Sequence, residues 1–322
     1  MKNEAAEYLV TNCIDSYRKD VLIIYDDTTE DIVDLFYAAL LKHGKNIKVV
    51  KLDVAHCHGE EPHQGIAERM LGSEAIMCIT QYSLAHTEAR KKAEKKGITF
   101  LSMPEYCDNL LCNQAIFVDY HAKLAQVKKY TDFLTKGEKV EVETESGSRI
   151  YLDIQNRIGN CCPGMTTKDF LLGSPPDIEA NIAPIENKTN GRLVVDGSIT
   201  DYRIGLLKEP VVLNIEEGFI QDIKSSDKKI EKMIDHIFSD IHSPNAYVVG
   251  EFGIGINDCA QLCGNMLVDE GVKGCVHFGM GSNWTIGGKN RVNFHLDFVI
   301  KNATVIIDDK VVIDKGELIY DK

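Results

Sequence analysis

The 322-residue sequence lacks several features that would define its class immediately. It has no apolar run approaching the roughly 18 residues that cross a bilayer, so no membrane-spanning helix is expected. Its first residues, MKNEAAEYLV, contain no apolar core of signal-peptide length. Basic residues are scarce, with 36 Lys and Arg against 49 Asp and Glu, a net charge of −13. An acidic chain repels phosphate backbones and anionic lipid, so neither nucleic acid nor a membrane is expected as a partner.

The ten cysteines include no C-x-x-C pair of the kind that forms zinc knuckles. Cys161 and Cys162 are adjacent, and Cys259 and Cys263 are spaced as on successive turns of a helix. A chain of this length can bury a sufficient core without cross-links. We therefore expect reduced thiols in a cytoplasmic protein, with both pairs serving as small buried residues rather than as ligands.

What the sequence does contain is the composition of a globular protein. Hydrophobic residues make up 44% and charged residues 26%, which supplies enough apolar side chains for a packed core. At roughly 150 residues per domain, the length predicts two domains. A change in pattern places their boundary near residue 112, giving domains 1–112 and 113–322.

Short apolar runs alternate with amphipathic stretches in the first domain. Strands are predicted at 21–25, 47–54, 75–80 and 98–103, and helices at 29–43, from about 65, and at 84–96. Gly97 closes the last of these helices. Strand and helix alternating at this spacing predict an α/β domain with a doubly wound, Rossmann-like parallel sheet.

Residues 113–322 favour an α+β domain with largely antiparallel strands. A helix is predicted at 118–135, followed by a hairpin through Ser146-Gly147-Ser148. Several β-rich runs come after it, with helices near 225–240 and 257–270.

The strongest local chemical signal is Asn293-Phe294-His295-Leu296-Asp297-Phe298, whose alternation predicts a strand. Residues two apart on a strand point to the same face, so His295 and Asp297 project together and can hold a divalent ion. A surface ion pair is the competing explanation for this spacing.

Other candidate ligands lie in glycine-rich or apolar stretches. His277 lies in CVHFGMG and Glu251 in GEFGIGIN, where glycines let the backbone approach a ligand or another strand closely. Glu186 ends the apolar stretch NIAPIE, and a carboxylate in such surroundings needs a partner or a metal. Two His and three carboxylates suit divalent ions such as Zn, Mn, Fe or Co.

The first domain has a histidine cluster of its own, His56-Cys57-His58-Gly59-Glu60-Glu61-Pro62-His63, between a strand and a helix. Open α/β sheets bind ligands at such a place, although a solvated loop is the simpler explanation. His86, at the start of the helix after the third strand, has the same two interpretations.

Together these segments resemble the aminopeptidase T family of leucyl metalloaminopeptidases and the dihydroxypyridine dioxygenases that share their fold. The stretches that carry the resemblance run through most of the chain: Ser83-Leu84-x-His86-Thr87-x-Ala89-Arg90, Ser102-Met103-Pro104, NIAPIE, GRLVVDGSI, EPVVLNIEEG, GEFGIGIN, GCVHFGMG, FHLDF and DDKVVIDKGEL.

The resemblance implies a two-metal site built from two Glu, two His, one Asp and one Tyr. Carried over by motif, the metal ligands are Glu186, with Glu179 as the fallback, and Glu251, His277, His295 and Asp297. Glu186 and Glu251 also receive the catalytic role, and His86 and Trp284 the binding of substrate. Trp284 occupies the place of the family tyrosine, and no Tyr lies between His277 and His295. An indole cannot ligate a metal as a phenolate does.

Three functions remain open. We favour a cytoplasmic metallo-aminopeptidase, a hydrolase in which two Zn, Co or Mn ions activate a water that cleaves N-terminal residues from small peptides. The alternative is a ring-cleaving dioxygenase that holds one Fe(II) on His277, His295 and Asp297 and stacks a small dihydroxypyridine-like aromatic on Trp284. The third is a non-catalytic protein on a decayed enzyme scaffold. The resemblance also implies a homodimer.

Overall fold

A computed structural model describes residues 1–320 of the chain. It divides into two compact units, one made of residues 1–124 and 162–178, the other of residues 125–161 and the chain from Glu179 onward. The sequence predicts a domain boundary near residue 112, whereas the chain first passes from one unit to the other after residue 124. Residues 162–178, expected in the second domain, belong to the first unit, because strand β8 (Leu172–Gly173) within them pairs with strand β4 (Thr99–Ser102).

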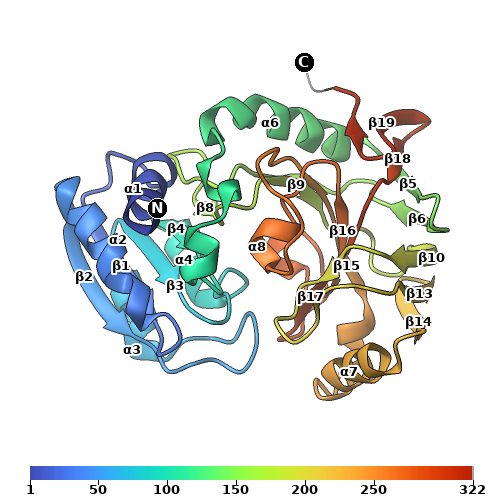
Figure 1. Cartoon of the computed structure of the whole chain (residues 1–322), viewed down its shortest axis with the longest axis horizontal. Helices are drawn as coiled ribbons and strands as arrows, with labels where there is room; N and C mark the ends of the chain where they lie inside the picture. Colours follow the sequence, from blue (N-terminus) through green and yellow to red (C-terminus); the bar gives the residue numbers. More distant parts are fainter. Residues whose placement is uncertain (321–322) are drawn as a thin grey trace. The chain divides into compact units, whose positions relative to one another are not determined.

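The first unit is built on a parallel sheet with the strand order β2-β1-β3-β4-β8 (Figure 1). Its other strands are β1 (Asp20–Tyr25), β2 (Asn46–Lys51) and β3 (Ala75–Ile79). Its helices are α1 (Lys2–Cys13), α2 (Glu30–Lys42), α3 (Gln64–Met70), α4 (Glu88–Lys95), α5 (Asp108–Leu111) and the 3-10 turn η1 (Gln114–Phe117). The predicted α/β fold with a doubly wound parallel sheet is confirmed.

Alternation along the central strand explains the two covered faces of this sheet. Leu22 and Ile24 of β1 lie in one buried cluster with residues of α3 and α4, among them Ile66 and Ala93. Val21 and Ile23 point to the opposite face, and α1 and α2 pack against each other. Gly97, with a φ of +76°, ends α4 as the sequence predicts.

The second unit contains two further sheets. The strand order of the first is β14-β13-β10-β6-β5-β18-β19-β20, and that of the second is β12-β11-β17-β16-β15-β9-β7. The first sheet comprises β5 (Lys139–Glu143), β6 (Arg149–Asp153), β10 (Asn190–Val195), β13 (Val211–Glu216), β14 (Phe219–Ser225), β18 (Thr304–Ile307), β19 (Lys310–Asp314) and β20 (Glu317–Leu318). The second comprises β7 (Asn160–Cys162), β9 (Glu179–Ile182), β11 (Ser198–Ile199), β12 (Gly205–Leu206), β15 (Val249–Gly255), β16 (Val276–Gly281) and β17 (His295–Ile300).

Antiparallel pairing in both sheets confirms the predicted character of the second domain. The remaining elements are α6 (Tyr120–Lys136), which begins in the first unit, α7 (Lys228–Ser239), α8 (Met266–Asp269), η2 (Pro244–Tyr247) and η3 (Trp284–Ile286). The hairpin predicted through Ser146–Ser148 joins β5 to β6.

The helix predicted at 257–270 is wrong over most of its length, since only α8 forms. The Asp269 carboxylate accepts hydrogen bonds from the backbone N–H groups of Cys263 and Gly264, and Gly264 has a φ of +85°. This geometry orders a loop in place of a helix. Cys259 and Cys263 are consequently exposed, contrary to the expectation that they are buried.

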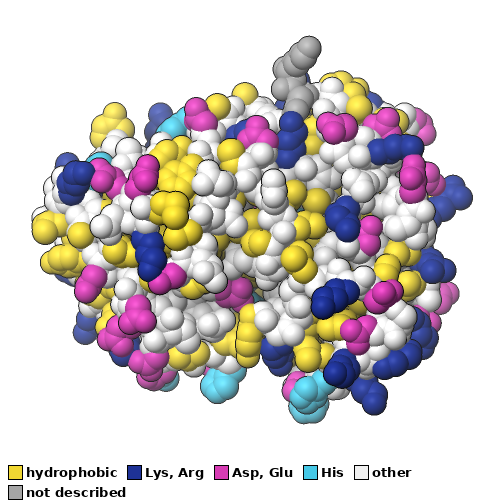
Figure 2. All heavy atoms as spheres, viewed as in Figure 1, with side chains coloured by type: hydrophobic (Ala, Val, Ile, Leu, Met, Phe, Trp, Pro, Cys, Tyr) yellow, Lys and Arg dark blue, Asp and Glu magenta, His cyan; other side chains and the backbone are white. Residues whose placement is uncertain are grey.

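Buried cysteines do occur elsewhere in the chain. Cys78 and Cys275 are buried thiols, and burial raises the pKa of each to about 12, so they behave as small apolar residues. No helix within residues 1–320 is long and apolar enough to cross a membrane. On the face drawn in Figure 2, acidic and basic side chains are intermingled.

Candidate metal centre

Four neighbouring strands of the second unit, β9, β15, β16 and β17, carry acidic and imidazole side chains on one face of a sheet. Glu251 of β15 lies opposite Gly279 of β16, which in turn lies opposite Asp297 of β17. Residues that face each other across antiparallel strands share a side of the sheet. The two-residue spacing puts His295 on the same side as Asp297, as the strand prediction requires.

A bulge in β15 determines where Glu251 points. Val249 pairs with Met280, whereas Glu251 pairs with Gly279, so two steps on β15 correspond to one step on β16. Gly250 is the extra residue. In a strand that kept Gly250 but formed no bulge, Glu251 would follow Val249 onto the apolar face, because residues two apart share a face. The bulge therefore turns Glu251 toward the other polar side chains, as bulges near functional sites do.

Five side chains gather into two overlapping groups that can hold a cation. Glu179, Glu251 and His277 form one group, and Glu251, His295 and Asp297 form the other, with ligand atoms within 4.8 Å of one another. Nε2 of His277 lies 2.9 Å from Oε2 of Glu179, and Nε2 of His295 lies 3.2 Å from Oδ1 of Asp297. Glu251 belongs to both groups, and its two oxygens lie 4.0 Å from His277 Nε2 and 3.3 Å from His295 Nε2.

Two glycines leave the space that these ligand atoms occupy. A Cβ at Gly279 would lie 2.7 Å from both Asp297 Oδ1 and His295 Nε2. A Cβ at Gly253, which pairs with His277, would overlap the His277 ring. The glycines that stood out in GEFGIGIN and GCVHFGMG thus form the floor of the site.

Hydrogen bonds outside the cluster orient its members and leave particular atoms for a cation. Nδ1 of His295 lies 3.1 Å from the carbonyl oxygen of Ser282, which can only accept, so Nδ1 carries a proton and Nε2 is the atom that can bind a cation. Glu179 Oε2 and Asp297 Oδ1 are buried and accept no well-aligned hydrogen bond among the described residues. Buried oxygens of this kind, beside imidazole nitrogens, fit a divalent cation.

The electrostatics of the cation-free cluster agree with this assignment. Burial raises the pKa of Glu251, but hydrogen bonds with His277 and His295 outweigh it and lower the pKa below its usual value. Burial lowers the pKa of His277 and His295, but Glu179 acting on the first and Asp297 acting on the second raise both well above the usual value. A cation that binds here must displace the imidazole protons.

We expect the stability of the cation-free protein to fall as the pH rises above about 6.5, the unperturbed pKa of His. Folding raises the pKa of His277 and His295, so their contribution is complete below the unfolded pKa and is lost as the pH rises through the folded pKa. Added zinc should act oppositely, because it binds deprotonated imidazoles. Melting curves with zinc or with chelator should therefore diverge from about pH 6 to about pH 8. Convergence over this range would contradict the assignment.

Glu186, expected as a metal ligand and catalytic residue, belongs to neither group. Its carboxylate accepts hydrogen bonds from Arg157 Nη2 at 2.6 Å, Asn283 Nδ2 at 3.2 Å and the backbone N–H of Lys289. These donors already compensate the negative charge of the Glu186 carboxylate, which was the reason to expect a metal there. Glu179, the fallback, takes its place in the cluster. The alternation of Glu179-Ala180-Asn181-Ile182 is the sequence signal that could have favoured it.

The two residues expected to bind substrate lie in different units. Trp284 begins η3 in the second unit, two residues after the Ser282 carbonyl that orients His295. The Arg291 guanidinium carbon lies 4.3 Å from the centre of the Trp284 ring, a cation–π contact. His86 belongs to the first unit and precedes α4. Its part in substrate binding stays a prediction.

The His56–His63 segment lines a cavity of about 240 Å³ in the first unit. His56 pairs with Glu60 and His63 with Asp53, and both imidazoles are exposed. Glu61 accepts hydrogen bonds from the N–H groups of Glu88 and Ala89 at the start of α4. These contacts are those of a solvated loop that caps a helix.

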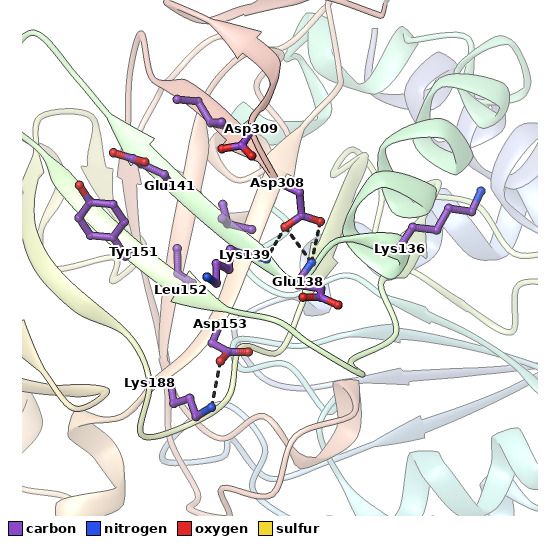
Figure 3. A pocket seen from close by; sticks show the side chains of 12 residues that line it. Lys136, Glu138, Lys139, Glu141, Tyr151, Leu152, Asp153, Lys188, Asp308 and Asp309 are labelled. Carbon is purple, nitrogen blue, oxygen red and sulfur yellow. Dashed lines mark hydrogen bonds and ion pairs between the residues drawn. The ribbon is translucent and has the colours of Figure 1, made fainter.

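A larger cavity of about 670 Å³ lies on the polar side of strands β5, β6 and β18 in the second unit (Figure 3). Its rim is held by Asp308, whose carboxylate accepts from the N–H groups of Glu138 and Lys139, and by the Lys188–Asp153 ion pair. It shares no residue with either ligand group.

The family model of 2,5-dihydroxypyridine 5,6-dioxygenase matches residues 10–320. A 2,5-dihydroxypyridine 5,6-dioxygenase of Pseudomonas putida strain KT2440 is 30% identical over 148 residues, which cover 42% of this chain and 41% of that protein. The alignment thus spans about two fifths of the relative.

Two solved structures share the fold. The 2,5-dihydroxypyridine dioxygenase structure from Pseudomonas putida KT2440 superposes with a TM-score of 0.84 at 18% identity, covering 100% of this chain and 97% of that chain. AmpT from Thermus thermophilus superposes with a TM-score of 0.71 at 13% identity, covering 99% and 98%. The resemblance found in the sequence is confirmed, and the match over residues 10–320 shows that the chain is an enzyme-family member: it belongs to the 2,5-dihydroxypyridine 5,6-dioxygenase family.

Proposed function

We propose that this protein is a metal-dependent dioxygenase that opens the ring of a small dihydroxypyridine-like aromatic. The observation that carries the proposal is the family match from residue 10 to residue 320, which includes every residue of the two ligand groups. A dioxygenase retains both oxygen atoms of O₂ in the ring-opened product, so the reaction needs no external reductant. Our first preference from the sequence was a hydrolase, and the family match favours the alternative.

The composition of the site suits this chemistry. His277, His295 and Asp297 are two imidazoles and one carboxylate, a set that holds Fe(II), and such an ion would supply the activation of O₂ and bind the ring hydroxyls. The two imidazoles lie on either side of Glu251, in different ligand groups. Glu251 is ionised, since its pKa is lowered. Its carboxylate can therefore accept a hydrogen bond from a substrate hydroxyl.

Trp284 is the candidate for substrate stacking. The Arg291 guanidinium carbon lies 4.3 Å from the centre of its ring, Trp284 is partly exposed, and an indole can stack on an aromatic substrate. A guanidinium beside the indole would also favour an electron-rich, anionic ring such as a deprotonated dihydroxypyridine. His86 keeps its proposed role in substrate binding.

A second candidate is a two-metal, aminopeptidase-like hydrolase. It is favoured by one observation, the membership of Glu251 in both ligand groups. A carboxylate shared in this way can bridge two ions, and two-metal sites hold the nucleophile of hydrolytic reactions. Glu179 is a further buried carboxylate that one ion on the His277–His295–Asp297 set would leave without a cation.

Metal content and two assays separate these candidates. The protein is stripped with chelator under anaerobic conditions and reloaded with Fe(II), or with Zn, Co or Mn. We expect iron-loaded protein to consume O₂ in proportion to 2,5-dihydroxypyridine, with no hydrolysis of aminoacyl-anilides. Two ions per chain with anilide hydrolysis and no O₂ uptake would replace the dioxygenase by the hydrolase. A fully loaded protein inert in both assays would support a non-catalytic role. Sedimentation of the same samples tests the proposed homodimer.

A further inference from the structure

Two asparagine side chains connect the ligand Glu179 to the segment that carries Trp284. Nδ2 of Asn181 donates to Oε1 of Glu179 at 2.7 Å. Oδ1 of Asn181 accepts from Nδ2 of Asn160 at 2.9 Å. The same Asn160 nitrogen lies 3.1 Å from the carbonyl oxygen of Ile286, the last residue of η3. The chain of contacts runs from the cluster through two amides to the backbone of η3.

The orientation of both amides is fixed by the groups at the two ends. The Ile286 carbonyl can only accept, so Asn160 must present its nitrogen. Oε1 of Glu179 is the acceptor at the other end, so Asn181 presents its nitrogen there and its oxygen to Asn160. A flip of either amide would place two acceptors or two donors against each other. Each hydrogen bond between Glu179 and the Ile286 carbonyl therefore joins one donor to one acceptor.

Strand geometry explains why Asn181 can do this. Asn181 lies two residues after Glu179 on β9, so both side chains project from the same face. Its side chain is 4% exposed, which shields the hydrogen bond from water. Because Oε1 of Glu179 is held by this bond, Oε2 is the oxygen directed toward His277 Nε2.

The η3 segment is also tied to the other ligand group. The backbone carbonyl of Ser282, just before it, accepts a hydrogen bond from His295 Nδ1–H. Arg157 donates to the carbonyl oxygen of Gly287, just after it, and to Glu186. The residues around Trp284 thus bond to groups that orient Glu179 on one side and His295 on the other.

We propose that Asn181 and Asn160 are positioning residues that fix the Glu179 carboxylate for a cation and transmit occupancy of its ligand group to the Trp284 segment. This inference rests on the cation binding that the proposed function requires, and does not depend on which reaction follows. A cation bound to Glu179 would shift its carboxylate. Because Asn181 is hydrogen-bonded to that carboxylate and Asn160 to Asn181, the shift would reach the backbone carbonyl of Ile286, beside Trp284.

The chain has a single tryptophan, so its emission reports on this segment alone. Zn²⁺ is the probe, because it does not quench fluorescence through unpaired electrons. In the wild-type protein, zinc should bind and change the Trp284 emission. Asn181→Ala removes the donor to Glu179 and should weaken zinc binding about 10- to 100-fold, the usual loss when a partner of a ligand is removed. Asn160→Ala should keep zinc affinity within about tenfold while it reduces the emission change at saturation by more than half.

Asn160 is only partly buried, so its variant tests the coupling even if Asn181→Ala fails to fold. The matched control is Asn214→Ala, which removes another asparagine-to-carboxylate bond, to Asp222, on the other sheet. It should match the wild type in zinc affinity and emission. If Asn181→Ala bound zinc as tightly as the wild type, or if Asn160→Ala showed the full emission change, this inference would be overturned and the proposed function would stand. Wild-type protein that binds zinc without an emission change would do the same, and wild-type protein that binds no zinc would overturn the proposed function with it.

Discussion

Glu251→Gln should reduce the metal content of the protein to background. Glu251 is the one residue common to both ligand groups, and its oxygens lie near both imidazoles. The amide has the same shape but carries no charge and offers one oxygen instead of two. Loss of the several kcal/mol that a metal contributes to a transition state corresponds to about a 10³-fold fall in kcat. Metal per chain is measured by mass spectrometry after dialysis, with circular dichroism as the check on folding.

The control for this substitution is Glu186→Gln. Both residues looked like ligands from the sequence, but Glu186 binds Arg157 and the loop after β16. Its amide variant should keep the metal content of the wild type and lose about 1–3 kcal/mol of stability, because it leaves a largely buried guanidinium without its charge partner. Full metal content in Glu251→Gln, or background content in Glu186→Gln, would show that the cluster has been assigned wrongly.

Gly279→Ala should reduce activity about 10²-fold through a single methyl group. The added Cβ would lie 2.7 Å from Asp297 Oδ1 and from His295 Nε2, closer than real Cβ atoms approach. Both ligands must move, and a displacement of 1 Å in a catalytic group can cost about 10²-fold in rate. Overpacking of this kind also destabilises by about 1–3 kcal/mol. Zinc titration and O₂ uptake measure the loss.

Gly65→Ala provides the matched control for the added methyl group. Gly65 lies in α3 of the first unit, and a Cβ there meets nothing within 4 Å. Alanine at an unstrained helical glycine stabilises by about 0.4–1 kcal/mol. Unaltered zinc affinity in Gly279→Ala would mean that the ligand atoms do not occupy the space above this glycine.

The sequence predicted those parts of the site that depend on local periodicity. The two-residue spacing of His295 and Asp297 was enough to put them on one face of β17. Helix and strand spacing likewise predicted the parallel sheet of the first unit. The choice between Glu179 and Glu186 depends on which strand neighbours β15, and the pairing of β9 with it is a contact between residues about 70 positions apart in the chain, as for Gly253 and Asn181. Glu186 has an equally apolar local context, so composition could not separate the two.

The assignment of residues 162–178 failed for the same reason. β8 is two residues long and joins a sheet whose other strands all precede residue 103. A segment so short has no periodicity that could assign it to a domain. His277 and Glu251 were found because glycines surround them, a signal of close approach rather than of pairing.

The bulge at Gly250 decides which residues of β15 point to which side of the sheet. A strand has two sides, so the number of residues between two positions decides, as odd or even, whether they share a side. One additional residue accommodated as a bulge reverses that parity for everything after it, and here it turns Glu251 from the apolar face toward the candidate ligands. A regular strand through the same residues, with no bulge, would put Glu251 on the side of Val249 and Phe252 on the side of the imidazoles, whereas deletion of Gly250 would remove the bulge and leave Glu251 opposite Gly279. In this sheet the presence or absence of one bulge therefore decides whether Glu251 or Phe252 faces the imidazoles, without any substitution of either residue.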